Sequence, residues 1–381
     1  MSYHGHFENQ KPRKRKSAKK IILIVIAVLL VLATGVVIAA VSYYKSMLNK
    51  VNIIEMPTQV TETAAAETTQ TTVATETTAA ATTVETTVET TVETTVPPMT
   101  PEDILNILVV GQSGRAGEEA ALADTMILVS INKYTKTLTL TSFLRDTYVD
   151  LPDYRDANGK LRTCGWNKLT SCYAVGYSFG GTGYAMGMTN LCLQNNFGVE
   201  VDYNVEINFE SLIKVVDLMG GVYLELTQAE ADYLNKDNYQ GQTFTAGFQG
   251  LDGTDALSYA RMRKAEGDND SDIKRTSRQR YMLEMLFKQL NNQGLSFAQK
   301  VANEVLPMIT TNMPEDKITE CLVELLPMLP SLSIESGTCP VETTYWPEYK
   351  DTPDGYLPVL MFDQGQNTRL MRAITEGETA E

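Results

Sequence analysis

A run of 24 uncharged residues near the N-terminus, residues 21–44, limits what this chain can be. As a helix rising about 1.5 Å per residue it would reach about 36 Å, enough to cross a hydrocarbon core about 30 Å thick. A cleaved signal peptide has a shorter apolar stretch, and no small-residue cleavage site follows this one. The run therefore predicts one transmembrane helix that tethers a folded domain to a membrane.

The charges around this helix predict its orientation. Residues 11–20 contain seven Lys or Arg, and the first twenty residues contain one acid, Glu8. Because Lys and Arg favour the cytoplasmic side, we expect residues 1–20 to be a basic cytoplasmic tail and the rest to face outward, a single-pass protein of the cell membrane. The other residues hold 25 basic and 46 acidic side chains, so we expect no nucleic-acid partner. A transcription regulator would also need its domain inside the cell.

Residues 45–100 read as a linker. They are rich in Thr, Ala and Glu, and "ETTV" occurs three times between Glu85 and Val96. Such a segment buries too little apolar surface to offset the entropy of ordering it. We expect a disordered extracellular linker that holds the domain away from the membrane, with folded structure beginning near Pro101.

The following residues alternate between strand and helix patterns. Strands are predicted for ILNILVV (104–110), MILVSIN (126–132), TLTLTSFL (137–144) and VDYNVEIN (201–208), and helices for 209–219, 272–293 and 314–328. Gly220 should end the first helix, and Asp252 should cap another. The mixture predicts an α/β domain over 101–310, an α-β-α sandwich around a central mixed sheet. Residues 311–381 form a C-terminal extension that reads as irregular from residue 330.

Histidine and cysteine usage restricts the chemistry. Both histidines, His4 and His6, lie in the basic tail, which excludes histidine-dependent catalysis or metal binding in the domain. Proton transfer there must use carboxylates, a Lys, a Tyr or water. The five cysteines form no CxxC pair; in an extracytoplasmic domain one or two disulfides are expected, with Cys164–Cys172 and Cys321–Cys339 as candidates.

An arginine cluster stands out in this acidic chain. In "SDIKRTSRQRYML" (271–283), helical geometry places Arg275, Arg278 and Gln279 near the core stripe marked by Met282, and Arg280 on the outer face toward solvent. Arginines on a solvated helix face would not lie beside the apolar core stripe. Arginines that point inward need partners.

Two kinds of partner remain open for these arginines. Asp272 lies three residues before Arg275 and could form an internal ion pair. Alternatively, an anion could bind at the helix N-terminus, where free N–H groups add to the guanidinium donors. Arg261 and Arg263 are spaced by two, so on an extended segment they would share a face and could join the same anion site.

Seven segments between Ile104 and Leu290, in a fixed order, carry a resemblance to a known family. They are "NILVVGQSGR", "ADTMILVSIN", "TSFLRDTYVDLP", "WNKLTSCYAVG", "DLMGGVYLEL", "FQGLDGTDALSYARMR" and "DIKRTSRQR". Together they resemble the LytR-CpsA-Psr family, whose members join glycopolymers to peptidoglycan outside Gram-positive cells.

The resemblance implies a phosphotransfer from a polyprenyl-pyrophosphate-linked glycan to peptidoglycan, with the lipid in an apolar tunnel between sheet and helices. It implies Mg²⁺ as cofactor, held by Asp124, and catalytic roles for Asp124, Arg145 and Asp146. The residues implied to bind the substrate are Arg115, Arg145, Arg261, Arg263, Arg275, Arg278 and Gln279.

Two departures from the family pattern keep a second reading open. Ser113 stands where the opening loop usually has Asp, and Leu122 where an arginine is usual. Glu118 or Glu119 could supply the missing carboxylate, since Mg²⁺ accepts carboxylate and water oxygens. The alternative is a non-catalytic module that binds polyprenyl phosphate or wall glycan. Trp166 and the aromatic residues after it are predicted to line the core or tunnel rather than to form a sugar platform.

Overall fold

The computed structural model describes residues 51–57, 100–112, 123–236, 242–263, 265 and 271–377. Within these ranges no helix is both long enough and apolar enough to cross a membrane. The predicted cytoplasmic tail, the predicted transmembrane helix and most of the predicted linker lie outside the described residues.

A seven-stranded mixed sheet, in the order β1-β12-β9-β2-β3-β4-β13, forms the centre of the molecule. Strands β2, β3 and β4 pair antiparallel, whereas β9 and β13 run parallel to β2 and β4 respectively. The predicted mixed sheet is therefore confirmed. The strands are β1 Asn52–Ile53, β2 Ile104–Gln112, β3 Ala123–Asn132, β4 Thr137–Phe143, β9 Tyr203–Ile207, β12 Thr310–Thr311 and β13 Ser333–Cys339.

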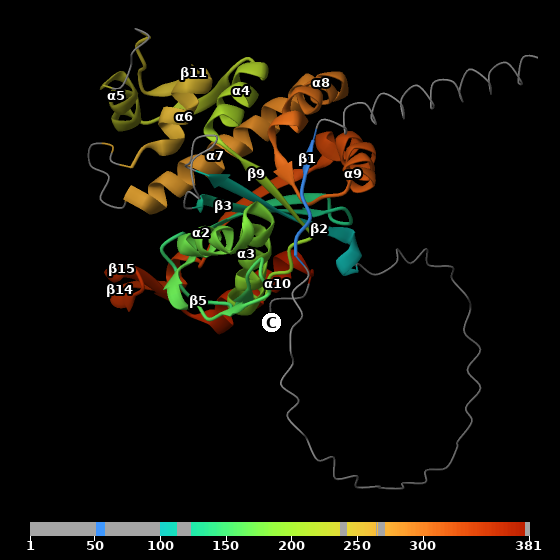
Figure 1. The fold of residues 1–381 in the computed structure, drawn as a ribbon. Helices are drawn as coiled ribbons and strands as arrows, with labels where there is room; N and C mark the ends of the chain where they lie inside the picture. Colours follow the sequence, from blue (N-terminus) through green and yellow to red (C-terminus); the bar gives the residue numbers. More distant parts are fainter. Residues whose placement is uncertain are drawn as a thin grey trace, which may run out of the picture.

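Helices cover both faces of this sheet (Figure 1). One layer contains α4 Phe209–Leu218, α5 Gln228–Lys236, α6 Gly253–Arg261, α7 Ser271–Gln293, α8 Leu295–Val305 and α9 Glu315–Met328. The opposite layer contains α2 Leu169–Gly180, α3 Thr182–Phe197 and α10 Gln364–Thr375. Short 3₁₀ turns occupy Pro101–Asp103, Leu306–Met308, Leu329–Ser331 and Glu342–Thr344. The α-β-α sandwich is as the sequence predicts.

The apolar side chains on the two faces of the main sheet follow the strand period of two. Leu108 and Leu128 pack with α2 and α3, while their neighbours Ile107 and Val129 pack with α7 on the other face. Because successive side chains of a strand point to opposite faces, a central strand covered on both sides needs apolar residues at nearly every position. This pattern predicted the buried strand at 104–110, whereas the strand at 201–208 was predicted from alternating apolar and polar residues.

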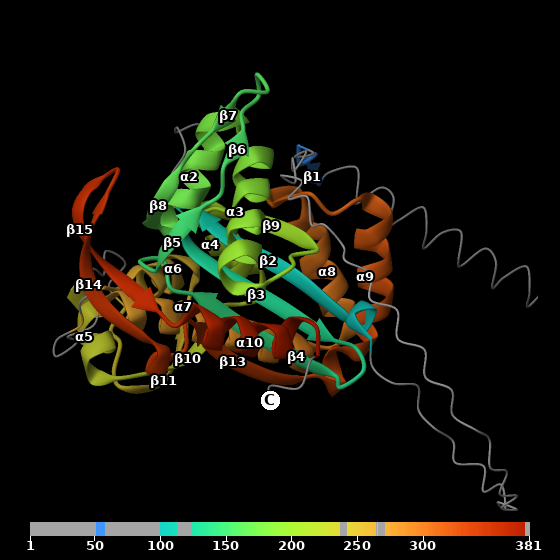
Figure 2. The same ribbon diagram turned by 90° about the horizontal axis from the view of Figure 1, so that it is seen from below.

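In the part of the chain that the structure describes, four two-stranded units lie outside the main sheet. They are β5 Tyr148–Leu151 with β8 Gly165–Lys168, β6 Tyr154–Arg155 with β7 Leu161–Arg162, β10 Val222–Leu226 with β11 Gly247–Leu251, and β14 Tyr345–Thr352 with β15 Gly355–Phe362. The last is a hairpin that stands away from the sheet beside α7 and β8 (Figure 2).

Two boundaries predicted from the sequence are wrong. Among the described residues, folded structure is already present before Pro101, because Asn52 and Ile53 of β1 pair with β12. Residues 330–381 are not irregular, because they contribute β13 to the main sheet, the β14–β15 hairpin and α10. The sequence hid these elements because β13 is a polar edge strand and the hairpin contains prolines, which strand patterns normally exclude.

The disulfide expectation is also wrong, because all five cysteines are free thiols. Cys172 and Cys339 are fully or almost fully buried. Burial raises the pKa of both thiols well above the ordinary value, and it raises the pKa of Cys164 to about 11. Because the thiolate is the reactive form, these cysteines act as small apolar side chains.

Helix α6 begins as predicted, and its cap leads to a pH-dependent expectation. The Asp252 carboxylate accepts hydrogen bonds from Thr254 N and Asp255 N, both at 2.9 Å. Burial, together with the charge of Asp252, raises the pKa of Asp255 from 3.8 to about 6. The folded protein thus holds this proton more tightly than the unfolded chain, so the free energy of unfolding should fall as pH rises from about 4 to about 6.

We expect Asp255→Asn to remove this pH dependence, because an amide does not ionise and can still donate to Asp252. Thermal unfolding between pH 4.5 and 7.5 measures it: the variant should gain Tm relative to the wild type as pH rises. Asp316→Asn, an exposed acid in the first turn of α9, is the matched control. If the difference in Tm between the variant and the wild type stayed constant from pH 4.5 to 7.5, the prediction would be contradicted.

Candidate functional site

A cavity of about 360 Å³ lies between the sheet and the helix layer that contains α7. Its walls come from the ends of β2 and β9, the start of β3, and helices α4, α5, α6 and α7. The residues that line it are Val109, Gly111, Gln112, Asp124, Thr125, Ile127, Ile207, Asn208, Phe209, Leu212, Tyr233, Leu257, Ala260, Arg261, Arg263, Arg275, Gln279, Met282, Leu283 and Leu286. Most are apolar, and the charged ones are three arginines and one aspartate.

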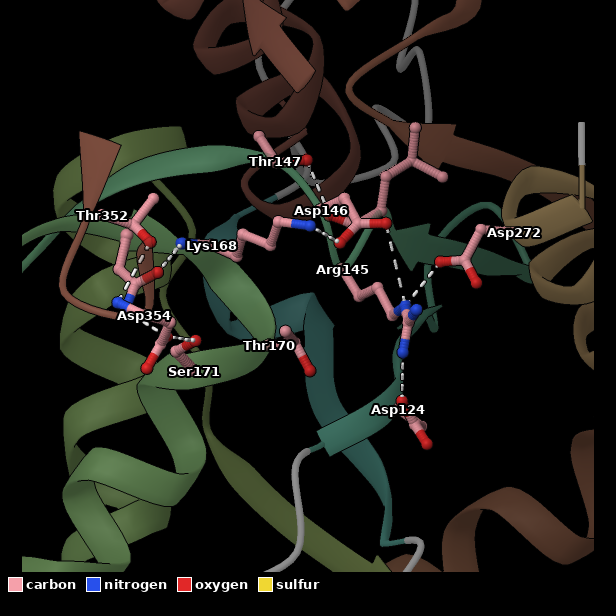
Figure 3. Close-up of polar contacts among 12 residues, drawn as sticks. Asp124, Arg145, Asp146, Thr147, Lys168, Thr170, Ser171, Asp272, Thr352 and Asp354 are labelled. Carbon is pink, nitrogen blue, oxygen red and sulfur yellow. Dashed lines mark hydrogen bonds and ion pairs between the residues drawn. The ribbon is translucent and has the colours of Figure 1, made fainter. Parts of the chain in front are cut away.

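Asp124, Arg145 and Asp272 meet because three element ends converge beside this cavity. Asp124 is the second residue of β3, Arg145 follows β4, and Asp272 is the second residue of α7. Because β3 and β4 pair antiparallel, the start of β3 adjoins the end of β4. Figure 3 shows the Arg145 guanidinium between the two carboxylates. Arg145 Nη1 lies 2.5 Å from Asp124 Oδ1, and Nε lies 2.5 Å from Asp272 Oδ2.

The balance of these charges fixes the state of Arg145. Burial acts to lower the pKa of its guanidinium, but Asp272, Asp146 and Asp124 outweigh it and raise the pKa above the ordinary value. Arg145 is therefore a permanent cation held in one place. Such a preorganised donor is suited to stabilising negative charge.

Arg275 is the most buried charged side chain at the cavity, with 2% of its surface exposed. One of its Nη atoms lies 3.3 Å from Asp272 Oδ1 and 3.3 Å from the backbone oxygen of Asp124. Its Nε has no hydrogen-bond partner among the described residues. Burial lowers the pKa of Arg275, with Asp272 opposing the shift. A buried guanidinium with an unused donor is costly unless a ligand completes it.

Arg261 and Arg263 complete a positive rim. The Arg261 guanidinium lies 4.9 Å from the centre of the Phe209 ring, and Arg263 Nη2 lies 4.0 Å from Asp124 Oδ1. Arg261 ends helix α6 rather than lying on an extended segment, as the sequence had suggested, yet both arginines line the cavity. With Arg145 and Arg275 they make four cations against Asp124 and Asp272, a surplus of two positive charges.

The inward residues predicted on α7 divide between two places. Gln279 lines the cavity, donating to Ala260 O at 3.1 Å, and its Oε1 has no partner among the described residues. Arg278 points into the protein away from the cavity: it lies 2.7 Å from Glu230 Oε1 and donates to Met262 O at 3.2 Å. The structure therefore does not bring Arg278 to the other arginines at the cavity.

Arg280 is not on a solvent-facing surface, so that prediction is wrong. It is half-buried, and burial lowers the pKa of its guanidinium, an effect that Glu284 partly opposes. Together with residues of β13 and α10 it lines a separate cavity. The helical phase was correct, but the C-terminal elements cover the face that the sequence assigned to solvent.

Asp146 lies on the other side of Arg145, in a second cavity of about 130 Å³. Its carboxylate is paired with Lys168 Nζ at 2.8 Å (Figure 3), and Arg145 and Asp272 line the same cavity. Lys168 was not singled out from the sequence. Nothing in the local sequence "WNKL" indicates a functional role for this lysine, which becomes evident only when the fold places it beside Asp146. The ion pairs of Arg145 thus separate two cavities.

Other predicted residues have different outcomes. Arg115, Ser113 and Leu122 lie outside the described residues. Trp166, predicted to line the core or tunnel, is 48% exposed and packs beside Tyr148 with ring centres 5.3 Å apart. That prediction is wrong for Trp166, whereas Tyr173 from the same stretch is fully buried.

Comparison with known proteins agrees with this architecture. The model of the LytR_cpsA_psr family matches residues 58–358. The chain is 35% identical over 182 residues to the polyisoprenyl-teichoic acid–peptidoglycan teichoic acid transferase TagU of Bacillus licheniformis, covering 48% of this chain and 51% of that protein. The TagU protein of Bacillus subtilis is 34% identical over 183 residues. The chain thus spans about half the length of these curated relatives.

Solved structures share the fold at lower sequence identity. The crystal structure of Bacillus subtilis TagT has a TM-score of 0.52 and 22% identity, covering 75% of this chain and 95% of that one. A TagT structure with bound octaprenyl pyrophosphate lipid has a TM-score of 0.50 and 20% identity, covering 74% and 95%. Because the family model covers most of the sequence and the described fold agrees with it, the chain belongs to the LytR-CpsA-Psr family.

Proposed function

We propose that this protein transfers a glycopolymer from a polyprenyl-pyrophosphate carrier to peptidoglycan, by phosphotransfer outside the cell. The observation that carries the proposal is the buried Arg275, which lines a largely apolar cavity and whose Nε has no partner among the described residues. An apolar cavity suits a polyprenyl chain, and a cationic rim suits the diphosphate attached to it. Support also comes from the relatives named as teichoic acid transferases and from the TagT structure with bound octaprenyl pyrophosphate.

The charges support a diphosphate in particular. The surplus of two positive charges from the four arginines and two aspartates matches the charge of about −2 on a pyrophosphate diester. Each charge-assisted hydrogen bond from a guanidinium contributes about 1.5–3 kcal/mol. On binding, the phosphate oxygens would take over donors that Asp124 and Asp272 now hold.

The proposed reaction uses both cavities. An acceptor hydroxyl enters from the side of Asp146, and its oxygen attacks the phosphorus that bears the glycan. A new P–O bond forms, the bond from this phosphorus to the bridging oxygen breaks, and polyprenyl phosphate leaves in the apolar cavity. The hydroxyl proton passes to the Asp146 carboxylate, which Lys168 holds in position. Arg145, between the cavities, stabilises the charge on the transferring phosphoryl group.

A magnesium ion fits this site with help from the substrate. Among the described residues no group of three or more His, Cys, Asp or Glu could hold a metal. However, Mg²⁺ is often bound by one or two carboxylates together with substrate phosphates and water. Asp124 lines the cavity. Among the described residues, the ion pairs between Asp124 and the arginines all involve its Oδ1. When bound, the ion would neutralise charge on the diphosphate.

The full chain in detergent, supplied with a polyprenyl-pyrophosphate-linked glycan and peptidoglycan oligomers, tests the function. We expect product formation with Mg²⁺ and a loss of about 10²–10³-fold on chelation or in Asp124→Asn, since either removes a preorganised charge contact. Binding of the donor without product under any metal condition would instead indicate the non-catalytic binding module. In that case the protein has the fold of the family but no transferase activity.

The localisation is part of the same proposal. The basic residues before 21–44 and the acidic balance after them support a single-pass protein of the cell membrane, with a cytoplasmic N-terminus and an outward domain. A polyprenyl carrier and peptidoglycan also meet on that side in Gram-positive cells. Protease added to intact cells should then digest the domain and spare the N-terminal tail.

A further inference from the structure

The β14–β15 hairpin is fixed to the reaction site at its base. Leu360 N donates to Asp146 O at 2.8 Å, and Leu360 forms a parallel bridge with Thr147. Near the tip, Asn167 Nδ2 donates to Asp354 Oδ2 at 3.1 Å. The hairpin therefore has a defined position relative to the residue after Arg145, although it lies outside the main sheet (Figures 1 and 2).

The pleat of the hairpin separates a packed face from an open one. Tyr349 pairs with Pro358 and Asp351 with Tyr356, so these four side chains point to the same side. Tyr349 is 61% exposed and Tyr356 67% exposed, whereas Val359, on the opposite side, is 1% exposed. The hairpin is therefore stabilised through one face and presents the other to solvent.

The open face is continuous with the second cavity. Pro347, Pro358 and Leu360 line that cavity together with Arg145 and Asp146. Pro347 shares the open face with Tyr349, two residues further out. A molecule lying along the hairpin would therefore reach the reacting groups from the side opposite the apolar cavity.

The two tyrosines form an exposed, stacked aromatic pair. Their ring centres lie 5.5 Å apart with 26° between the ring planes, a stacked arrangement. Aromatic rings have an electron-rich face, on which the slightly positive C–H groups of a pyranose ring can pack. Contiguous exposed apolar side chains, such as these two rings beside two prolines, often mark an interaction site.

Charge distinguishes between the two polymers of the proposed reaction. Lys350 is paired with Glu348 at 2.6 Å, which leaves Asp351 and Asp354, on the outer part of the hairpin, without a cationic partner among the described residues. This surface repels a phosphate-rich glycopolymer and tolerates an uncharged saccharide chain. The donor glycan is therefore an unsuitable occupant, and the sugar backbone of the acceptor is a suitable one.

We propose that Pro347, Tyr349, Tyr356 and Pro358 form the docking surface for the glycan strand of the acceptor, and that this surface guides an acceptor hydroxyl into the cavity at Asp146. The inference rests on the proposed transfer for its biological meaning. Its physical content is narrower: the hairpin binds an uncharged chain of N-acetylated sugars, with or without turnover.

Binding of a β-1,4-linked N-acetylglucosamine hexamer to the full chain in detergent tests this directly, with no donor present. We expect the dissociation constant to rise at least about tenfold in the double variant Tyr349→Ala/Tyr356→Ala, because both rings on which a sugar could pack are lost. The double variant Tyr349→Phe/Tyr356→Phe should bind nearly as the wild type does, because it keeps the rings. Tyr134→Ala, which removes a 45% exposed tyrosine in the β3–β4 turn, is the matched control and should change nothing.

The outcomes separate this inference from the proposed function. Hairpin-dependent binding of the hexamer without transfer would contradict the function and leave the docking surface intact. Transfer activity with hexamer binding unaffected by the alanine variant would overturn the docking surface alone. Tighter hairpin-dependent binding of a polyglycerol phosphate than of the hexamer would overturn it too, because the surface would then serve the anionic polymer.

Discussion

Arg275→Ala is expected to reduce glycopolymer transfer by about 10²–10³-fold and to keep a fold close to native. Arg145→Ala is expected to reduce transfer by at least as much. Removing one preorganised donor from a charge-stabilising site costs this much in rate. Arg275 is buried at the cavity, and its Nε is unpartnered among the described residues. The fold should survive its loss because Asp272 keeps its 2.5 Å contact with Arg145.

A transfer assay with thermal unfolding of the same samples makes the measurement. Arg369→Ala, on the exposed side of α10, is the matched control and should leave both activity and Tm unchanged. Arg275→Lys should recover little, because an ammonium group cannot present the two-pronged geometry of a guanidinium. If Arg275→Ala turned over at the wild-type rate, the arginine clamp would have no part in the mechanism.

Arg278→Ala is expected to act on stability instead. Arg278 and Glu230 are 7% and 8% exposed, and they lie 2.7 Å apart between α7 and α5. Removing one partner of a buried ion pair leaves an uncompensated charge and costs about 3–5 kcal/mol in the free energy of unfolding. Denaturant unfolding would measure this loss as a lower midpoint at unchanged slope.

The paired variant separates this role from ligand binding. Replacing both residues, as in Arg278→Leu/Glu230→Leu, should recover much of the lost stability, because two apolar side chains leave no buried charge. A stable Arg278→Ala protein with a donor KM raised tenfold would instead support the phosphate-binding role that the resemblance implied. The 3.2 Å bond to Met262 O suggests that Arg278 contributes to the site by holding the turn between Arg261 and Arg263.

The sequence predicted the elements that have strong periodicity. Strands β2, β3 and β4 and helices α4, α7 and α9 are found within a few residues of their predicted bounds, because each presents a regular apolar face. Helical phase also predicted that Arg275 and Arg278 point inward. It could not predict what they meet inside, because Glu230 and Asp124 come from distant segments whose approach depends on the fold.

Residues brought together over long sequence separations were missed. Lys168 and Asp146 come from separate segments, and Leu360 reaches Asp146 across more than two hundred residues. The hairpin itself resembles a loop in sequence, since its prolines interrupt the β pattern and its tyrosines lie on an open face. Arg280 was assigned to solvent for the same reason: the elements that cover it had not been recognised.

The pairing of β1 with β12 changes what the Thr-rich tract can do. Asn52 and Ile53 are already part of the sheet, and the chain rejoins the same domain at Thr100, so the tract begins and ends on one body. With the predicted anchor ending at residue 44, seven residues, 45–51, set the reach between bilayer and protein. At about 3.5 Å each they extend no further than roughly 25 Å. Because β1 precedes the Thr-rich tract in the sequence, that tract adds nothing to the distance between the predicted anchor and the sheet, so the spacer role predicted for residues 45–100 would fall to residues 45–51 alone.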